Sequence, residues 1–250
     1  MAKRQKLEDG DMEAKEFFGG AGRASAGRLS LKAGRQREGG REDRWNDPDP
    51  WDEDRISSSG GFRLPVTYSG MILALCVILF FVRVLAPAFT FDYLALNPAT
   101  VASRPWTLIT HMFIHADMGH LFFNMLFLFF FGMELENRVG ESKFLQIFII
   151  SGIVGAVGQM AVLPAGSMVG ASGALFGVMG CLAVIAPEIK VLLFFFIPLS
   201  IRAAVVLFAV IDFTMMGSGD SIAHMAHITG LLAGLAYGGM LKDRYRYRYR

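Results

Sequence analysis

The sequence predicts an all-α membrane protein, built as a bundle of six transmembrane helices with a disordered N-terminal tail. Three observations lead to this fold class. Of the 250 residues, 53% are hydrophobic, and the mean hydropathy is positive, which is too apolar for a soluble domain of this length. The apolar residues gather in six stretches that suit membrane helices. The charged residues gather before residue 67.

The uneven distribution of charge divides the chain into three parts. Residues 1–66 hold 13 of the 24 Lys and Arg and 13 of the 22 Asp and Glu, so this tail is densely charged but neutral overall. We expect it to be disordered and cytoplasmic. It resembles neither a secretory signal, because no apolar core follows its first basic residues, nor an acid-poor transit peptide. Residues 67–241 form the predicted membrane domain, and residues 242–250 form a basic tail suited to anionic lipid.

Each membrane segment should be helical, because lipid offers no partner to unpaired backbone groups. The six predicted helices cover approximately Tyr68–Pro87, Gly119–Met133, Lys143–Leu163, Ala171–Ala186, Pro198–Met216 and Ile222–Leu241. Residues 191–197, which read VLLFFFI, either lengthen the fifth helix or lie at the membrane interface.

The positions of Lys and Arg predict the orientation in the membrane. Arg138, Lys143 and Lys190 fall in connections on the same side as the basic C-terminus, whereas the long first loop carries only Arg104. The positive-inside rule then places both termini in the cytoplasm. In that orientation the second, fourth and sixth helices all run from the outer to the inner surface.

Three polar residues on these three helices share one predicted depth. Asn124, Ser172 and His227 each precede the inner end of their helix by 14 or 15 residues, which is about 21–23 Å at the helical rise. In a hydrocarbon core of about 30 Å they would lie roughly 8 Å below the outer surface. A pocket that is polar only in its outer half is therefore expected.

Small residues predict that the fourth and sixth helices touch. The sixth has Gly230, Gly234 and Gly238 at four-residue spacing, and the fourth has Gly173 and Gly177. Such ridges allow transmembrane backbones to approach closely. This packing would bring His227 toward Ser172.

The polar residues at this depth match the parts of a nucleophilic site. A serine needs a base to take its proton, and Ser172 and His227 would supply the two groups. His120 and Asn124 lie four residues apart on one helix face and could stabilise an oxyanion. The sequence suggests no carboxylate suited to orient His227, since Asp220 falls in a loop. A Ser–His dyad is therefore the preferred interpretation.

These residues resemble the rhomboid intramembrane serine proteases over approximately Gly70–Leu241. The family motif Gly-x-Ser-Gly stands at residues 170–173, which implies that Ser172 is the nucleophile. The motif Ala-His-x-x-Gly-x-x-x-Gly stands at 226–234, which implies that His227 is the base and that Gly230 and Gly234 are structural. His-x-x-x-Asn runs from His120 to Asn124, which implies an oxyanion hole shared with the Ser172 backbone amide.

The resemblance extends to residues outside the catalytic pair. Trp106 in the first loop and Glu136 and Arg138 after the second helix match structural positions of the family. Two positions depart from it: Thr107 stands where arginine is frequent, and Phe176 stands where a tyrosine often follows the nucleophile. Phe176 could still stack on His227. Gly170 and Phe176 would line the substrate site.

The resemblance implies a cofactor-free and metal-free serine endopeptidase that cuts other transmembrane proteins near the outer ends of their helices. The fifth helix and the loop 217–221 would form a lateral gate and a cap. Asp212 is then either a polar contact in the gate or a residue that reaches to the membrane surface, and we prefer the second. His111, His115 and His224 are expected to be structural or to face loops. A multi-pass location in the plasma membrane is expected.

Two other functions remain open from the sequence. A rhomboid-like protein that binds membrane clients without cleaving them would usually lack the Ser172/His227 pair. A small transporter would need polar residues in the inner half of the bundle, but residues 127–131 and 183–186 are apolar. A metal site at His115 and His120 has no third ligand at a suitable spacing. No nucleic-acid motif is present, and neither Cys76 nor Cys181 matches a metal or redox spacing. The oligomeric state is open.

Overall fold

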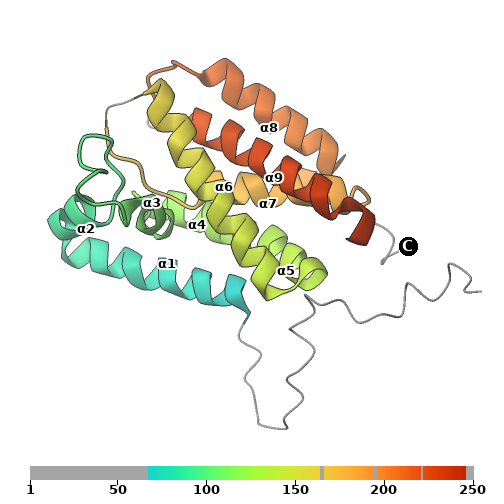
Figure 1. Cartoon of the computed structure of the whole chain (residues 1–250), viewed down its shortest axis with the longest axis horizontal. Helices are drawn as coiled ribbons and strands as arrows, with labels where there is room; N and C mark the ends of the chain where they lie inside the picture. The colour runs from blue at the N-terminus through green and yellow to red at the C-terminus, as the bar shows by residue number, and fades with distance from the viewer. Residues whose placement is uncertain (1–66, 164–165, 194–195, 221, 246–250) are drawn as a thin grey trace, which may run out of the picture. The chain divides into compact units, whose positions relative to one another are not determined.

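The computed structural model describes residues 67–163, 166–193, 196–220 and 222–245. The predicted disordered tail, 1–66, and the last five residues lie outside the described part of the chain. The described residues form a bundle of helices, and each of the six predicted stretches contains one (Figure 1).

The chain enters the bundle through α1 (Tyr68–Leu85), which is followed by the short α2 (Pro87–Tyr93). Glu136 fixes the start of α1 from across the bundle. Its carboxylate accepts hydrogen bonds from the amide of Tyr68 at 2.6 Å, from the amide of Ser69 at 2.9 Å, and from the Ser69 hydroxyl. These amides belong to a helix N-terminus, where a negative charge is stabilising. The buried Glu136 therefore ties the start of α1 to α5.

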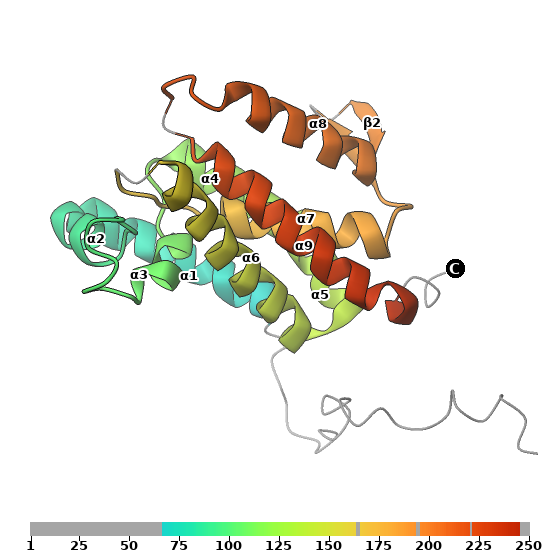
Figure 2. The ribbon, with the colours of Figure 1, turned by 45° about the horizontal axis from the view of Figure 1, so that its top comes forward.

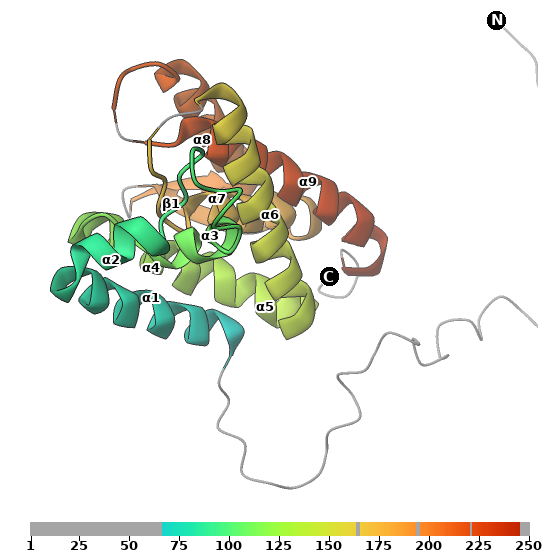
Figure 3. The same cartoon turned by 60° about the vertical axis from the view of Figure 1, so that its left-hand side comes forward.

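The long loop after α2 contains the short helices α3 (Thr107–Thr110) and η3 (His111–Phe113), and Figure 3 shows it from the side of α1 and α4. The indole of Trp106 donates to the carbonyl of Tyr93 at 2.8 Å, and Arg104 lies over the Tyr93 ring. Trp106 and Arg104 thus both anchor this loop to Tyr93 at the end of α2. Thr107 is buried and donates to the Arg104 carbonyl at 2.7 Å.

The second long helix extends farther than predicted. It comprises α4 (Met118–Phe127), a π-helical turn η4 (Leu128–Gly132) and α5 (Met133–Val139). Asp117 accepts a hydrogen bond from the His120 amide at 2.8 Å and so begins this helix. Gly140, at φ +83°, separates it from α6 (Glu141–Val162).

The second half of the bundle contains α7 (Ser172–Ile185), α8 (Ile201–Met215) and α9 (His224–Tyr245). The all-helical prediction is wrong between α7 and α8, where β1 (Lys190–Leu193) pairs antiparallel with β2 (Ile197–Ser200). Residues 191–193 and 197 therefore belong to strands and do not lengthen the fifth helix. The backbone amides and carbonyls of these two strands pair with each other, where the all-α prediction expects pairing within helices.

In the described part of the chain, three helices are long and apolar enough to cross a membrane. They are Tyr68–Leu85, Met118–Val139 and Glu141–Val162, and α7 is a shorter apolar helix. The protein thus has the apolar helices of a membrane protein.

Helix α7 occupies the centre of the bundle. It contacts α4, η4, α5, α6, α8 and α9, and apolar residues are buried all around it. Figure 2 shows α9 crossing in front of α7, with α6 on one side and α8 on the other. A helix that is apolar on every face belongs in such a position.

The predicted glycine contact between α7 and α9 is present. A methyl group on Gly234 would overlap the carbonyl oxygen of Gly177, and one on Gly230 would overlap the carbonyl oxygen of Gly173. The two backbones therefore touch without intervening side chains. Gly239, on the same helix, has no atom within 4 Å of the same position.

Gly234→Ala should destabilise the fold, because the new methyl group meets backbone that cannot rotate away. We expect a loss of about 1–3 kcal/mol, the usual cost of overpacking. The matched variant Gly239→Ala should leave stability unchanged or raise it by up to about 1 kcal/mol, since alanine favours helix. Thermal unfolding in detergent measures both. Equal effects of the two substitutions would contradict the close contact.

The loop histidines should make the fold sensitive to acid. Burial lowers the pKa of His111 to about 4 and the pKa of His115 to about 3, from an ordinary value of 6.5. Between pH 6.5 and these lowered pKa values, the two histidines bind protons in the unfolded chain but not in the folded chain. The free energy of unfolding therefore falls as the pH falls below 6.5. His111 Nδ1 donates to the Thr107 carbonyl at 2.8 Å, a bond that an asparagine amide could replace.

We therefore expect the unfolding temperature to fall between pH 7 and pH 5, and to fall less in His111→Asn. The two pH series, measured side by side, provide the check. An identical decrease in both proteins would rule out His111 as a source of the acid sensitivity.

Candidate active site

Ser172 is the first residue of α7, and the segment before it is held from two sides. Met168 and Leu96 exchange backbone hydrogen bonds of 3.0 and 2.7 Å, and the Gly170 amide donates to the His111 carbonyl at 2.9 Å. Gly170 has φ +119°, a conformation that L side chains rarely adopt. The sharp turn at Gly170 therefore places Ser172 where the loop meets the bundle.

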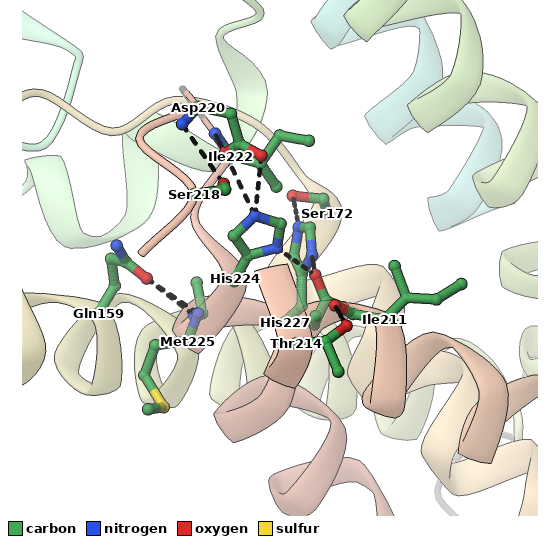
Figure 4. A network of polar contacts seen from close by, with 12 residues as sticks. Gln159, Ser172, Ile211, Thr214, Ser218, Asp220, Ile222, His224, Met225 and His227 are labelled. Atoms are coloured by element: carbon green, nitrogen blue, oxygen red, sulfur yellow. Dashed lines mark hydrogen bonds and ion pairs between the residues drawn. The ribbon is translucent and has the colours of Figure 1, made fainter. Parts of the chain in front are cut away.

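The structure brings Ser172 and His227 into contact. Ser172 Oγ lies 2.8 Å from His227 Nε2, although the two residues are 55 positions apart in the chain (Figure 4). Phe176, one turn after Ser172, stacks on the His227 ring with centroids 4.3 Å apart and planes at 5°. Phe176 thus limits the tilt of the imidazole without a phenol hydroxyl.

The start of α9 is fixed by α6 as well as by α7. The side-chain oxygen of Gln159 accepts hydrogen bonds from the amides of Met225 and Ala226, at 3.0 and 3.2 Å (Figure 4). These amides belong to the first turn of a helix, where no intrahelical acceptor is available. Gln159 on α6 therefore accepts the hydrogen bonds of the unpaired amides in the turn that carries His227.

The second nitrogen of His227 has a partner that the sequence analysis does not identify. His227 Nδ1 lies 2.9 Å from Asp212 Oδ1 on α8, so a carboxylate does contact the imidazole. Asp212 is buried, with 5% of its surface exposed, and does not reach toward the membrane surface as we had preferred. Asp212 lies near the C-terminal end of α8, close enough to His227 for its side chain to turn into the bundle.

His224 also belongs to this network, although the sequence suggested only a structural or loop role. Its Nδ1 lies 2.7 Å from the same Asp212 oxygen, and its Nε2 lies 3.1 and 3.2 Å from the two oxygens of Asp220. Asp220 is in the loop before α9, as predicted, and hydrogen bonds chiefly from the Ile222 amide lower the pKa of this carboxyl. The polar network therefore extends from Ser172 to the loop.

Among the described residues, Asp212, His224 and His227 could also present ligand atoms to a metal ion, since these atoms lie within 4.8 Å of one another. In the structure the Nδ1 atoms of His224 and His227 are hydrogen-bonded to Asp212 Oδ1, at 2.7 and 2.9 Å. Ligands about 2.0–2.1 Å from a tetrahedral zinc would stand about 3.3 Å apart. The observed spacing is that of hydrogen bonds.

His120 has the tautomer that an oxyanion donor requires. The Ala116 amide donates to His120 Nδ1 at 3.4 Å, so the proton lies on Nε2. This nitrogen is directed at the backbone beside Ser172, because a methyl group on Gly170 would come within 2.6 Å of it. Asn124 uses one of its two amide protons for the His120 carbonyl at 2.7 Å, which leaves the second for another acceptor.

Two cavities adjoin Ser172. A pocket of about 150 Å³ lies between α4 and α7 and is lined by Phe123, Asn124, Phe127, Ser172, Leu175 and Phe176. A smaller cavity of about 20 Å³, lined in part by His111, Gly170 and Ser172, has room for one water. The serine hydroxyl is therefore accessible to an apolar ligand chain from one side and borders a polar cavity on the other.

The remaining predicted residues make no hydrogen bond to Ser172 or His227 in the described part of the chain. Glu136 caps α1, and Trp106 anchors the loop to α2, as described above. Arg138 bonds to Glu134 at 2.6 Å and to Glu188 at 2.7 Å. His115 is fully buried against the His120 ring, at a centroid distance of 5.1 Å.

The chain is similar to proteins of known families. A family model described as the Rhomboid domain matches residues 102–244. "Rhomboid protein 1, mitochondrial" from Saccharomyces cerevisiae is 34% identical over 157 residues, which cover 58% of this chain and 44% of that protein. "Rhomboid protease GlpG" from Yersinia pestis is 31% identical over 133 residues, which cover 52% and 46%.

A third relative, "Putative rhomboid protease YdcA" from Bacillus subtilis, is 42% identical over 76 residues, which cover 30% of this chain and 38% of that protein. The chain thus spans about half or less of the length of these relatives. The matched region of the family model contains Ser172, His227, His120 and Asn124. Because this model matches more than half of the chain, the protein belongs to the rhomboid family.

Proposed function

We propose that this protein is an intramembrane serine endopeptidase that hydrolyses peptide bonds in or near the transmembrane helices of other membrane proteins. The observation that carries the proposal is the 2.8 Å contact between Ser172 Oγ and His227 Nε2 in a recessed, partly apolar pocket. Relatives that are named rhomboid proteases support the reaction class.

The reaction would begin at the serine hydroxyl. As Ser172 Oγ attacks the scissile carbonyl carbon, its proton passes to His227 Nε2, and the carbonyl oxygen becomes an oxyanion. His227 then gives this proton to the leaving amine, and the C–N bond breaks to leave an acyl-enzyme. Water, with His227 again as base, hydrolyses the ester and restores Ser172.

The oxyanion would be held by fixed donors. His120 Nε2 carries a proton and faces the Gly170–Ser172 backbone, and Asn124 retains one free amide proton. The Ser172 amide lies in the first turn of α7, where amides have no intrahelical partner. Donors that are already oriented do not have to reorganise as the charge forms.

We also propose that all six long helices cross the membrane, with both termini in the cytoplasm, on the distribution of Lys and Arg. Helix α7 has 14 residues and spans about 21 Å, less than the hydrocarbon core of about 30 Å, so Ser172 would lie below the outer surface. A peptide bond near the outer end of a substrate helix could reach it. The relative from Saccharomyces cerevisiae is named mitochondrial, so the relatives do not support the predicted plasma membrane.

The catalytic pair can be tested with a fluorogenic transmembrane-helix substrate in detergent. Ser172→Ala and His227→Ala should each lower kcat/KM by at least about 10³-fold, since either loss removes the activated nucleophile. Ser151→Ala, which alters another buried serine, should retain activity. A fluorophosphonate should label the wild type but not Ser172→Ala. Cleavage that persists in Ser172→Ala would refute the assignment.

The oxyanion donors can be tested at Gly170, whose replacement leaves both histidines in place. Gly170→Ala puts a methyl group against His120 Nε2, and we expect kcat to fall about 10²-fold, in the range of losing one oxyanion donor. Gly166→Ala is the matched control, because Gly166 has φ +87° but no atom within 4 Å. The assignment of His120 fails if both variants lose activity equally.

A further inference from the structure

The contact between His227 and Asp212 determines which nitrogen of His227 carries the proton. A carboxylate only accepts hydrogen bonds, so the 2.9 Å contact with Asp212 Oδ1 requires a proton on Nδ1. The neutral imidazole then has a free lone pair on Nε2, which faces Ser172 Oγ at 2.8 Å. Asp212 therefore holds His227 in the tautomer that accepts the serine proton.

The contacts of His224 indicate an imidazolium cation. Nδ1 faces Asp212 at 2.7 Å and Nε2 faces Asp220 at 3.1 Å, so both ring nitrogens face carboxylates and both must donate. Figure 4 shows the His224 ring between Asp220 and the α8 segment that carries Ile211 and Thr214. An imidazolium thus connects the loop carboxylate to the buried one.

The positive charge of His224 explains how the Asp212 carboxylate is accommodated on α8, whose other buried residues are apolar. The other buried residues of α8 are Ile201, Ala204 and Val205, all apolar. A buried carboxylate is strongly unfavourable unless it is paired and hydrogen-bonded. Asp212 receives two hydrogen bonds on one oxygen, from His224 and His227, which together meet that requirement.

We propose that Asp212 completes a Ser172–His227–Asp212 triad as a positioning residue, and that protonated His224 holds Asp212 in place. This inference rests on the proposed function, because it assigns a role to Asp212 within the same reaction. When His227 takes the serine proton it becomes an imidazolium, and the Asp212 charge 2.9 Å away stabilises it. No group beyond the chain is needed for this step.

The first test is Asp212→Asn, with kcat/KM measured against pH. The groups that face His227 and can carry charge are Asp212 on α8, His224 on α9 and His120 on α4. We expect kcat/KM to fall by about 10²- to 10⁴-fold, as when a triad carboxylate becomes an amide. The acidic limb should also move to lower pH, because a neutral amide no longer stabilises the protonated imidazole.

Asp92→Asn, an exposed acid on α2, is the matched control and should change neither the rate nor the profile. A merely structural role for Asp212 predicts a lower unfolding temperature and a lower rate with an unmoved acidic limb. That result would overturn the inference while the proposed function stood. If the wild type neither cleaves substrates nor reacts with the fluorophosphonate, the proposed function fails and the triad fails with it.

The role of His224 has its own test in a double-mutant cycle. His224→Asn should lower kcat/KM less than Asp212→Asn does, and should cost nothing further when Asp212 is already asparagine, since residues that act through one another are not additive. A full additional loss in the Asp212→Asn background would overturn the assignment of His224 as the residue that holds Asp212.

A measurement on the wild type avoids the risk that a variant fails to fold. The nitrogen NMR spectrum of the protein labelled in its histidines should show one ring that stays doubly protonated at about pH 8, well above the ordinary histidine range. His224→Asn should remove that signal. Neutral rings at every histidine would overturn the charged bridge.

Discussion

The close contact between the backbones of α7 and α9 determines the geometry of the site. Ordinary helices pack with axes about 8–10 Å apart, because side chains lie between them. Here Gly177 and Gly234 face each other with no side chain to separate the two backbones. A membrane provides no hydrophobic force between helices, so such close packing is a main source of their association. The hydrogen bond between Ser172 and His227 depends on this spacing, since each residue lies in the first turn of one of the two helices.

Helix α8 is held in a different way from the central helices. Its buried apolar residues, Ile201, Ala204 and Val205, lie in its first half, and its second half buries Asp212. Phe208 adds an edge contact to Phe176, with ring centroids 6.2 Å apart. The C-terminal half of α8 is therefore held to α9 by a polar contact. Polar contacts in a membrane are directional, so this one specifies the rotation of α8 as well as its position.

The sequence was sufficient to predict the central helices and the meeting of Ser172 with His227, because glycine spacing and helical depth are local properties of the chain. The role of Asp212 was missed for an identifiable reason. Asn124, Ser172 and His227 share one predicted depth on helices that are predicted to run inward, whereas α8 is predicted to run outward. Asp212 lies about 4.5 Å before the last residue of α8, near the depth predicted for Ser172. An ionisable residue in an apolar stretch was itself the available signal. The strands after α7 could not be distinguished from a helix in the sequence, because a short, continuously apolar run shows neither the strand nor the helix periodicity.

The position of Asp212 links the orientation of His227 to the position of α8. If the outer half of α8 moved away from α9, His227 Nδ1 would lose its acceptor, and the ring could take the tautomer in which Nε2 is protonated. Ser172 would then face a donor and could not transfer its proton. The pocket lined by Phe123, Phe127 and Phe176 lies between α4 and α7, so a ligand chain seated there can reach Ser172 while α8 remains bonded to α9. On the proposed mechanism, the chemical step therefore requires α8 to be in place, and any movement of α8 that admits a substrate has to be reversed before the serine can react.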